Sequence, residues 1–228
     1  MTGGQVQQWS KELGRWETVQ MSEVSTYVAT IIESIYELES NGATGAAVVG
    51  YFANDSKDVS FRGYKENGYS LNDYENIKVD RLFRKTKMLT TSGYLEADIF
   101  ISIGHELAHR IDQYENPKNY NDVWVDSDIK IMKRSELFAT HIENQIRAES
   151  GLPLRKYYSI SKAESSKTVN PDLKTRLIDS KGNSLFYKQT LPSIFDAVNR
   201  GEIFNSKYKH IKSKEAYNYY INNPKTKK

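Results

Sequence analysis

The residues best suited to chemistry in this 228-residue chain are His105 and His109, with Glu106 between them. Two histidines four positions apart lie one above the other on a helix, so both imidazoles can reach a single Zn²⁺. The glutamate one residue after the first histidine can hold a water beside that ion. This spacing is the H-E-x-x-H pattern of zinc metalloproteases, and it predicts a zinc site with Glu106 as a catalytic residue.

The neighbouring sequence predicts a helix through this motif. Apolar residues precede and continue it over residues 99–111, which is typical of a helix that crosses the core and shows only its His105/His109 edge to a cleft. The chain has only four histidines, and two of them stand at ligand spacing. The predicted fold is α+β: a single zincin-like domain with this helix in the core beside a small, mostly antiparallel sheet.

A catalytic zinc normally takes three protein ligands, so one more is needed. Glu136 is the predicted third ligand, because it lies near the start of the next expected helix. Glu143 falls on the same face and is the alternative. Asp112 lies about 10.5 Å along the helix from His105, so we expect it to orient a histidine ring through its free N–H. His141 lies roughly 140° round the helix from Glu136 and is expected to pack or hydrogen-bond instead.

The chemistry expected of such a site is peptide hydrolysis. Glu106 would take a proton from the attacking water and return it to the leaving amine. The developing oxyanion needs a second donor, for which Tyr157 is the prediction and Tyr158 the alternative, and a tyrosine could also be a switchable metal ligand. Aromatic packing is the simpler role for both. Arg147 and Arg155 could bind a substrate carboxylate, although a structural salt bridge is the expected role.

Three segments together resemble the NleD-like effector metalloproteases. They are GHELAH at 104–109, RSELFAT at 134–140 and ENQIRAESGLPLR at 143–155. The similarity covers roughly residues 22–158 and is most specific in the last segment, which a generic zinc protease lacks. The family includes type III effectors and the toxin domains at the C-terminal ends of Rhs and other polymorphic toxins.

The resemblance implies a secreted bacterial effector or toxin, a zinc endopeptidase that cleaves a protein in the target-cell cytosol. His105, Glu106 and His109 match the family's motif directly, and Glu136 matches the acidic residue of the following helix. A cognate immunity protein is an implied partner if the chain is a polymorphic toxin. The basic part from about residue 159 departs from the family pattern, so the resemblance gives it no role.

Composition excludes several other classes. The chain has no cysteine, so neither a disulfide framework nor a thiolate metal site is available. A net charge of +3 is too small to predict a nucleic-acid or membrane partner by itself. No run of about 18 apolar residues exists and residues 1–20 lack a secretory apolar region, so we expect a soluble chain whose export would not use a standard signal peptide.

Three further helices are predicted. Residues 22–40 carry an apolar stripe at helical spacing, with Ser22 as the expected N-cap and Gly42 just past the end. Residues 45–52 form a short apolar run for which a helix is favoured over a strand. Residues 132–150 have a buried side and end before a Gly-Leu-Pro sequence.

Strands are predicted at 58–63 and 76–82, where apolar residues alternate with polar ones. In metalloproteases of this type an edge strand beside the motif helix pairs with the extended substrate backbone. Either 87–91 or 76–80 is expected to serve that role.

The later part of the chain is less regular. A polar connection at 116–126 is expected to be anchored by Trp124, and 161–184 is expected to be a long surface loop. Residues 185–187 favour a strand and 192–199 a short helix.

The predicted organisation has three parts: a possible tag remnant at 1–5, a zinc metalloprotease domain at 6–204 and a basic tail at 205–228. The tail holds seven lysines against one glutamate, interleaved with tyrosines. This composition leaves open an alternative function, a zinc-stabilised binding module without turnover that contacts nucleic acid or an acidic protein through the tail. A solvated helix with a frayed end is the simpler expectation.

Overall fold

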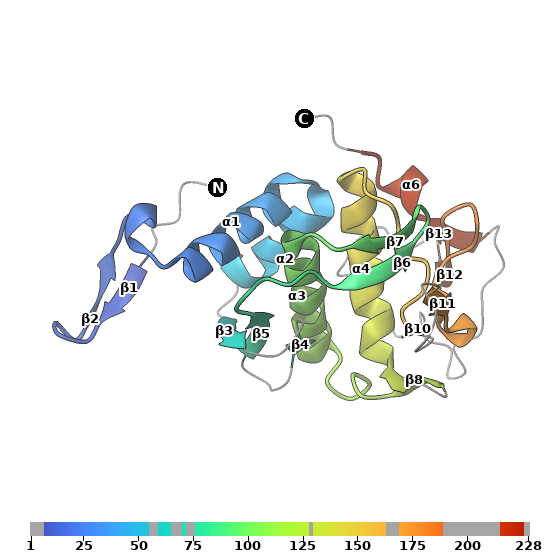
Figure 1. The fold of residues 1–228 in the computed structure, drawn as a ribbon, viewed down its shortest axis with the longest axis horizontal. Helices are drawn as coiled ribbons and strands as arrows, with labels where there is room; N and C mark the ends of the chain where they lie inside the picture. Colours follow the sequence, from blue (N-terminus) through green and yellow to red (C-terminus); the bar gives the residue numbers. More distant parts are fainter. Residues whose placement is uncertain are drawn as a thin grey trace.

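Two helices occupy the centre of the computed structural model, which describes residues 7–54, 59–64, 70–71, 76–127, 130–162, 169–188 and 215–225. They are α3 (Ile99–Glu115) and α4 (Arg134–Glu149), and they pack side by side (Figure 1). The predicted core helix through the motif is confirmed, since every residue of α3 from Phe100 to Asp112 is buried. The helix expected over 132–150 is confirmed as α4.

Helix α4 is buried on nearly all sides because it separates two hydrophobic clusters. Phe138, Ile142 and Ile146 of α4 belong to the first cluster, together with side chains of α3 and the N-terminal half. Leu137 and Ala148 belong to the second cluster, together with residues from the C-terminal part.

Helices α1 (Thr26–Ser40) and α2 (Ala43–Asn54) confirm the other two predicted helices and pack against α3. The predicted N-cap was wrong: Ser25, not Ser22, caps α1, and its hydroxyl accepts a hydrogen bond from the Val28 N–H. Ser22 lies in the short 3-10 helix η1 (Met21–Glu23) that precedes the cap.

A buried carboxylate of α4 fixes the start of α2. Glu149 accepts hydrogen bonds from the backbone N–H of Thr44 at 3.0 Å and from its hydroxyl at 2.8 Å. An anion at a helix N-terminus satisfies backbone donors that have no partner within the helix. Gly42 lies against the same carboxylate, where a Cβ would clash with it. Helix α2 is thereby attached to the C-terminal end of α4.

The strands form six separate small sheets among the described residues, not the single sheet that was predicted. One sheet has the order β3 (Ser60–Tyr64), β5 (Asn76–Asp80), β4 (Ser70–Leu71), and its β3–β5 pair is parallel. All other pairings are antiparallel. The α+β class and the strands predicted near 58–63 and 76–82 are confirmed.

Two hairpins flank the central helices. Strands β6 (Lys87–Thr90) and β7 (Gly93–Glu96) form one hairpin, which crosses α3 and α4 in the view of Figure 1. Strands β8 (Val123–Asp126) and β9 (Ile131–Lys133) form the other, inside the segment that was expected to be a plain connection. Trp124 is the buried anchor that was predicted, and its ring contacts those of two other aromatic residues.

The C-terminal part packs on the side of α4 away from the N-terminal helices (Figure 1). Its elements are β10 (Ile160–Lys162), β11 (Val169–Pro171), the 3-10 helix η2 (Leu173–Thr175), β12 (Asn183–Lys188), β13 (Ala216–Asn218) and α6 (Tyr219–Asn222). The predicted surface loop at 161–184 was wrong for its described part after residue 168, because Thr175, Leu177 and Ile178 are buried. The strand predicted at 185–187 is confirmed within β12.

Part of the predicted basic tail belongs to the folded body. Tyr217 and Tyr219 are buried, and the Tyr219 hydroxyl lies 2.8 Å from Nδ1 of His141 on α4. His141 also stacks on Tyr187, with ring centroids 3.7 Å apart. His141 is therefore a packing and hydrogen-bonding residue, as predicted. The helix expected at 192–199 lies outside the described residues.

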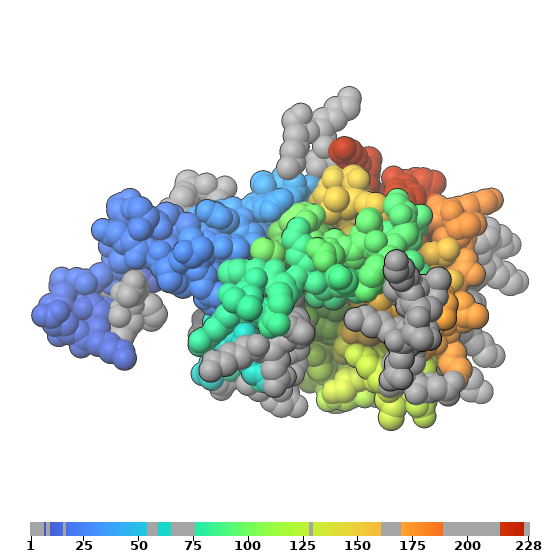
Figure 2. All heavy atoms as spheres, in the orientation of Figure 1, coloured from blue at the N-terminus to red at the C-terminus, as the bar shows by residue number. Residues whose placement is uncertain are grey.

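The N-terminal hairpin, β1 (Gln7–Ser10) with β2 (Arg15–Thr18), projects from one end of the molecule (Figures 1 and 2). Within the described residues, no helix combines the length and the apolar character that a bilayer crossing needs.

Candidate metal centre

The structure brings the three predicted ligands together. His105 and His109 project from one side of α3, one turn apart, and Glu136 projects from the first turn of α4. Oε2 of Glu136 lies 3.0 Å from Nε2 of His109 and 3.5 Å from Nε2 of His105. One ligand atom from each residue falls within 4.8 Å of the other two, so these three side chains could hold a metal ion.

The electrostatics of this cluster suit a cation. Burial opposes protonation of His105, but its hydrogen bonds to the Glu136 and Glu143 carboxylates outweigh burial and raise its pKa to about 9. Burial likewise opposes ionisation of Glu136, yet the two histidines hold the pKa of its carboxyl well below the ordinary value. The carboxylates thus favour positive charge at this point, which is what a bound metal ion would supply.

Glu143 lies behind His105 and not among the three ligand atoms. Its Oε2 is 3.0 Å from Nδ1 of His105, the ring nitrogen that faces away from Glu136. The same carboxylate accepts hydrogen bonds from Arg147 Nε at 2.8 Å and from Arg155 Nη1 at 3.0 Å. Both arginines therefore make the structural salt bridges that were expected of them, and Glu143 lies next to one of the three candidate ligands.

Asp112 has a different place from the one expected. Its Oδ1 accepts hydrogen bonds from the Arg134 guanidinium and from Nδ2 of Asn116. Nδ1 of His109 has no hydrogen-bond partner among the described residues, so the expected bond from a histidine to Asp112 is not formed. Asp112 instead ties the end of α3 to the first residue of α4.

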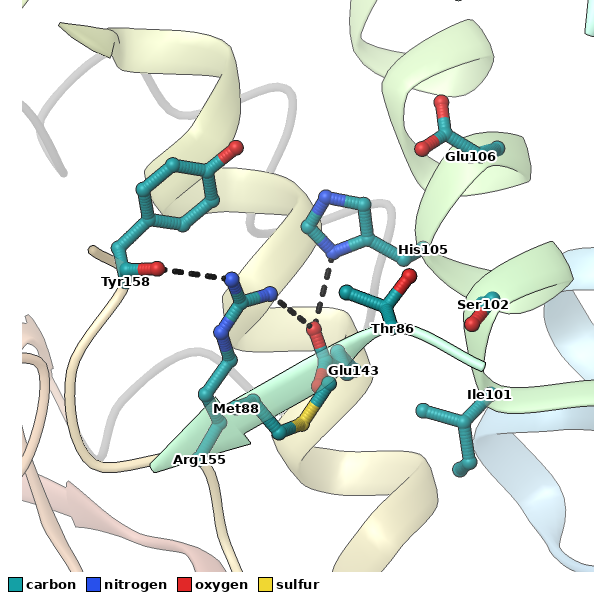
Figure 3. A pocket seen from close by; sticks show the side chains of 9 residues that line it. All are labelled: Thr86, Met88, Ile101, Ser102, His105, Glu106, Glu143, Arg155 and Tyr158. Carbon is teal, nitrogen blue, oxygen red and sulfur yellow. Dashed lines mark hydrogen bonds and ion pairs between the residues drawn. The ribbon is translucent and has the colours of Figure 1, made fainter. Parts of the chain in front are cut away.

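Glu106 and Tyr158 lie on the two sides of the His105 ring in Figure 3. Both line a cavity of about 100 Å³ beside that ring, and Glu106 is buried. The Tyr158 hydroxyl hydrogen-bonds to the Glu136 carboxylate, and burial together with the charge of Glu136 raises its pKa well above the ordinary value. Tyr158 thus stays protonated near neutral pH and remains able to donate a hydrogen bond.

The predicted donor Tyr157 lies elsewhere. Tyr157 is buried outside the cavity lining, where its backbone forms an isolated bridge with Arg176. Successive side chains of an extended segment point to opposite sides, so only one of two adjacent tyrosines can face the cavity. The structure brings Tyr158, the alternative, to the metal cluster.

The structure also places Tyr120 beside the cluster, which the sequence did not single out. Its ring centroid lies 6.3 Å from that of His109, and its hydroxyl hydrogen-bonds with Ser135. Burial and the nearby charges of Glu136 and Glu106 raise the pKa of the Tyr120 hydroxyl. The chain has 16 tyrosines and this one lies in a turn, so no spacing signal could have identified it.

Strand β6 and the residue before it form one wall of the cavity, where Met88 and Thr86 lie opposite the beginning of α3 (Figure 3). The segment after α4 pairs with β6 further along, where Lys156 N–H donates to the Leu89 carbonyl. Of the two segments expected to guide substrate, 87–91 lies beside the site as a strand. The other, 76–80, is the central strand β5 of its sheet, so the prediction that it offers an edge was wrong.

Comparisons with known protein families, with curated proteins and with solved structures found no match to this chain.

Proposed function

We propose that this chain is a zinc-dependent endopeptidase with a zincin-like active site. The observation that carries the proposal is the position of Glu136, whose Oε2 lies 3.0 and 3.5 Å from the Nε2 atoms of His109 and His105 while Glu106 lies beside the same cavity. Two histidines and a glutamate are a ligand set of catalytic zinc sites that leave one position open. Without cysteine in the chain, this is the set that the sequence offers.

Bound zinc would act as a Lewis acid on the substrate carbonyl and lower the pKa of a water to about 7. Glu106 accepts the proton of the attacking water and passes it to the leaving amine. The Tyr158 hydroxyl, which in this structure hydrogen-bonds to Glu136, turns its proton to the carbonyl oxygen as negative charge develops on it. A raised pKa suits this role, because Tyr158 keeps its proton while it stabilises an anion.

Strand β6 gives the substrate its orientation in this proposal. The beginning of β6, at Lys87 and Met88, extends past the pairing with the 154–156 segment and runs along the cavity wall. An extended peptide added to that edge would place a backbone carbonyl near the metal cluster without demanding particular side chains.

We further propose that the chain is an NleD-like effector or toxin, secreted from a bacterium and active on a protein in the target-cell cytosol. The segment that carries most of this resemblance, 143–155, supplies Glu143, Arg147 and Arg155, which form the ion cluster behind His105. A cognate immunity protein is part of the proposal if the chain belongs to a polymorphic toxin.

The alternative function, a binding module that uses its basic tail, has less support. Two tyrosines that would stack on a nucleic acid, Tyr217 and Tyr219, are buried against α4.

The proposal can be tested by mapping new protein N-termini in cells that express the wild type or Glu106→Gln. The matched control is Glu37→Gln, which makes the same chemical change at an exposed position of α1. We expect the wild type and the control to produce the same new N-termini and Glu106→Gln to produce none.

Metal content measured by mass spectrometry on the same proteins separates chemistry from metal binding. About one zinc per chain is expected in all three, because none of them changes a ligand, whereas Glu136→Gln should lose the metal. New N-termini that persist in Glu106→Gln would contradict the proposal.

A further inference from the structure

The Glu143 carboxylate is the centre of a buried polar cluster that joins α3, α4 and the segment after α4. It accepts hydrogen bonds from Arg147 and Arg155, and only 1% of its side chain is exposed. Its Oε2 also lies 3.0 Å from Nδ1 of His105 (Figure 3). Two arginines keep this buried carboxylate ionised, because each offers charge-assisted donors at close range. An ionised carboxylate can only accept hydrogen bonds, so the His105 nitrogen that faces it must carry a proton.

We propose that Glu143 is a positioning residue that fixes His105 with its proton on Nδ1 and its Nε2 lone pair directed at the metal, and that Arg155 holds Glu143 in place. This inference rests on the proposed metal site and deepens it. Nε2 of His105 is the nitrogen that lies 3.5 Å from Glu136, so the tautomer set by Glu143 is the one in which that nitrogen can bind a metal.

Arg155 extends this arrangement to the substrate side of the site. Its Nη2 donates to the Tyr158 carbonyl at 2.9 Å, and its guanidinium lies 4.6 Å from the centre of the Tyr158 ring. One guanidinium therefore fixes both the carboxylate behind a metal ligand and the tyrosine in front of it. A lysine has no planar fork and cannot make these contacts together.

The two histidine ligands are not held equally. Nδ1 of His109 has no hydrogen-bond partner among the described residues, whereas Nδ1 of His105 lies 3.0 Å from Glu143. Since this support is found on one histidine only, its loss at His105 should not be compensated elsewhere in the cluster.

The test is the zinc affinity of purified Glu143→Gln and Glu143→Asp, measured by competition with a chelating dye. Glu143→Gln removes the negative charge and keeps the shape of the side chain. Glu143→Asp keeps the charge that Arg147 and Arg155 bind, but its shorter side chain no longer reaches His105. Each should bind zinc about 10–100-fold more weakly than the wild type. Glu149→Gln is the matched control, because Glu149 is also a buried carboxylate of α4 but serves Thr44 and not the site.

Arg155→Gln should weaken zinc binding in the same direction. The double variant Glu143→Gln/Arg155→Gln should lose little more than Glu143→Gln alone, because both changes remove the same support. Additive losses would show that Arg155 does not act through Glu143 and would overturn that part of the inference.

A spectroscopic readout covers the case in which the variants do not fold. Long-range ¹H–¹⁵N spectra of the zinc-loaded wild type, with four histidines to assign, should show His105 protonated at Nδ1 and zinc on Nε2. Zinc on Nδ1 of His105 would overturn the inference, as would Glu143 variants that bind zinc within about twofold of the wild type. A wild type that binds no zinc would overturn the proposed function and this inference with it.

Discussion

Adjacent residues can have unrelated roles, and Tyr157 and Tyr158 are an example. Both follow the same Gly-Leu-Pro-Leu-Arg stretch, and residue type alone cannot separate them. The structure separates them by direction: Tyr158 lines the cavity and hydrogen-bonds to Glu136, while Tyr157 is buried outside it. The side of an extended segment that faces the site depends on how that segment pairs, and Arg155 sets this by its bridge to Thr90 of β6.

Tyr158→Phe should therefore lower the rate of substrate cleavage by about 10²–10³-fold, because it removes a donor to the developing oxyanion. Zinc content should stay at the wild-type level, since the hydroxyl is not one of the three ligand groups. Tyr157→Phe is the control and should cleave at close to the wild-type rate. The measurement is the initial rate at a cleavage site found by N-terminus mapping. Equal rates for Tyr158→Phe and the wild type would remove Tyr158 from the mechanism.

The sequence predicted the three candidate metal ligands better than the residues that support them. His105 and His109 were predictable because their spacing is local to one helix, and Glu136 because it lies near the start of the next one. Glu143 was considered only as a ligand, since its role depends on the angle between α3 and α4, which no single helix encodes. Tyr120 carried no signal at all.

At the scale of elements, all four long helices of the described part of the chain were predicted, because apolar periodicity and the glycine and proline residues near their ends are local signals. The pairing of the strands into sheets was not predicted. Strand β12 pairs with β13 about thirty residues later, and β3 pairs in parallel with β5, so neither pairing leaves a local pattern. The buried stretch around Thr175 was missed because it is polar. The Thr175 hydroxyl accepts a hydrogen bond from the Ser159 N–H at 3.0 Å and donates one to the Asp172 carbonyl at 2.8 Å.

At one position where α1 packs on α2, the expected effect of a glycine-to-alanine change on stability is opposite to the effect expected from helix propensity. Gly45 lies in the first turn of α2, and a Cβ there would overlap the backbone carbonyl of Leu38. Propensity alone favours alanine over glycine in a helix by roughly 0.5–1 kcal/mol. Because backbone cannot yield as a side chain does, Gly45→Ala should instead lower the free energy of unfolding by about 1–3 kcal/mol, as measured in urea.

Gly104→Ala is the comparison for this prediction. A Cβ at Gly104 would meet methyl groups of Ile146 and Leu38 at 3.0 and 3.1 Å, and the ends of flexible side chains can shift by that little. Its effect on unfolding should be smaller than that of Gly45→Ala. A more stable Gly45→Ala protein would show that the two helices do not approach so closely.

At the scale of the whole molecule, α4 packs in both hydrophobic clusters, and the proposed metal site depends on both. One side of α4 presents Glu136 and Glu143 towards α3, while His141 on another side holds the C-terminal part through Tyr187 and Tyr219. The residues that surround the His141 ring are phenols, Tyr187, Tyr217 and Tyr219, and burial lowers the pKa of His141 to about 3 from 6.5. Burial among these rings therefore disfavours the protonated form of His141.

His141 should therefore make the attachment of the C-terminal part sensitive to acid. Below pH 6.5 the unfolded chain protonates His141 and the folded chain does not. The contribution of neutral His141 to the free energy of unfolding is therefore complete above pH 6.5 and is lost progressively as the pH falls towards 3. Between about pH 7.5 and about pH 5.5 the loss should be about 1.4 kcal/mol.

In the metal-free protein His105 acts in the opposite direction, because its pKa of about 9 in the folded state lies above 6.5. Its contribution to the free energy of unfolding is present below pH 6.5 and is lost as the pH rises towards 9.

The effect of His141 must therefore be isolated by comparing the wild type with a variant that lacks only this titration. His141→Phe keeps a ring to stack on Tyr187 but cannot titrate. Urea unfolding of both metal-free proteins at the two pH values should show a drop in the free energy of unfolding that is smaller by about 1.4 kcal/mol in the variant. Equal drops in the two proteins would show that His141 is already protonated, or exposed, in the folded state.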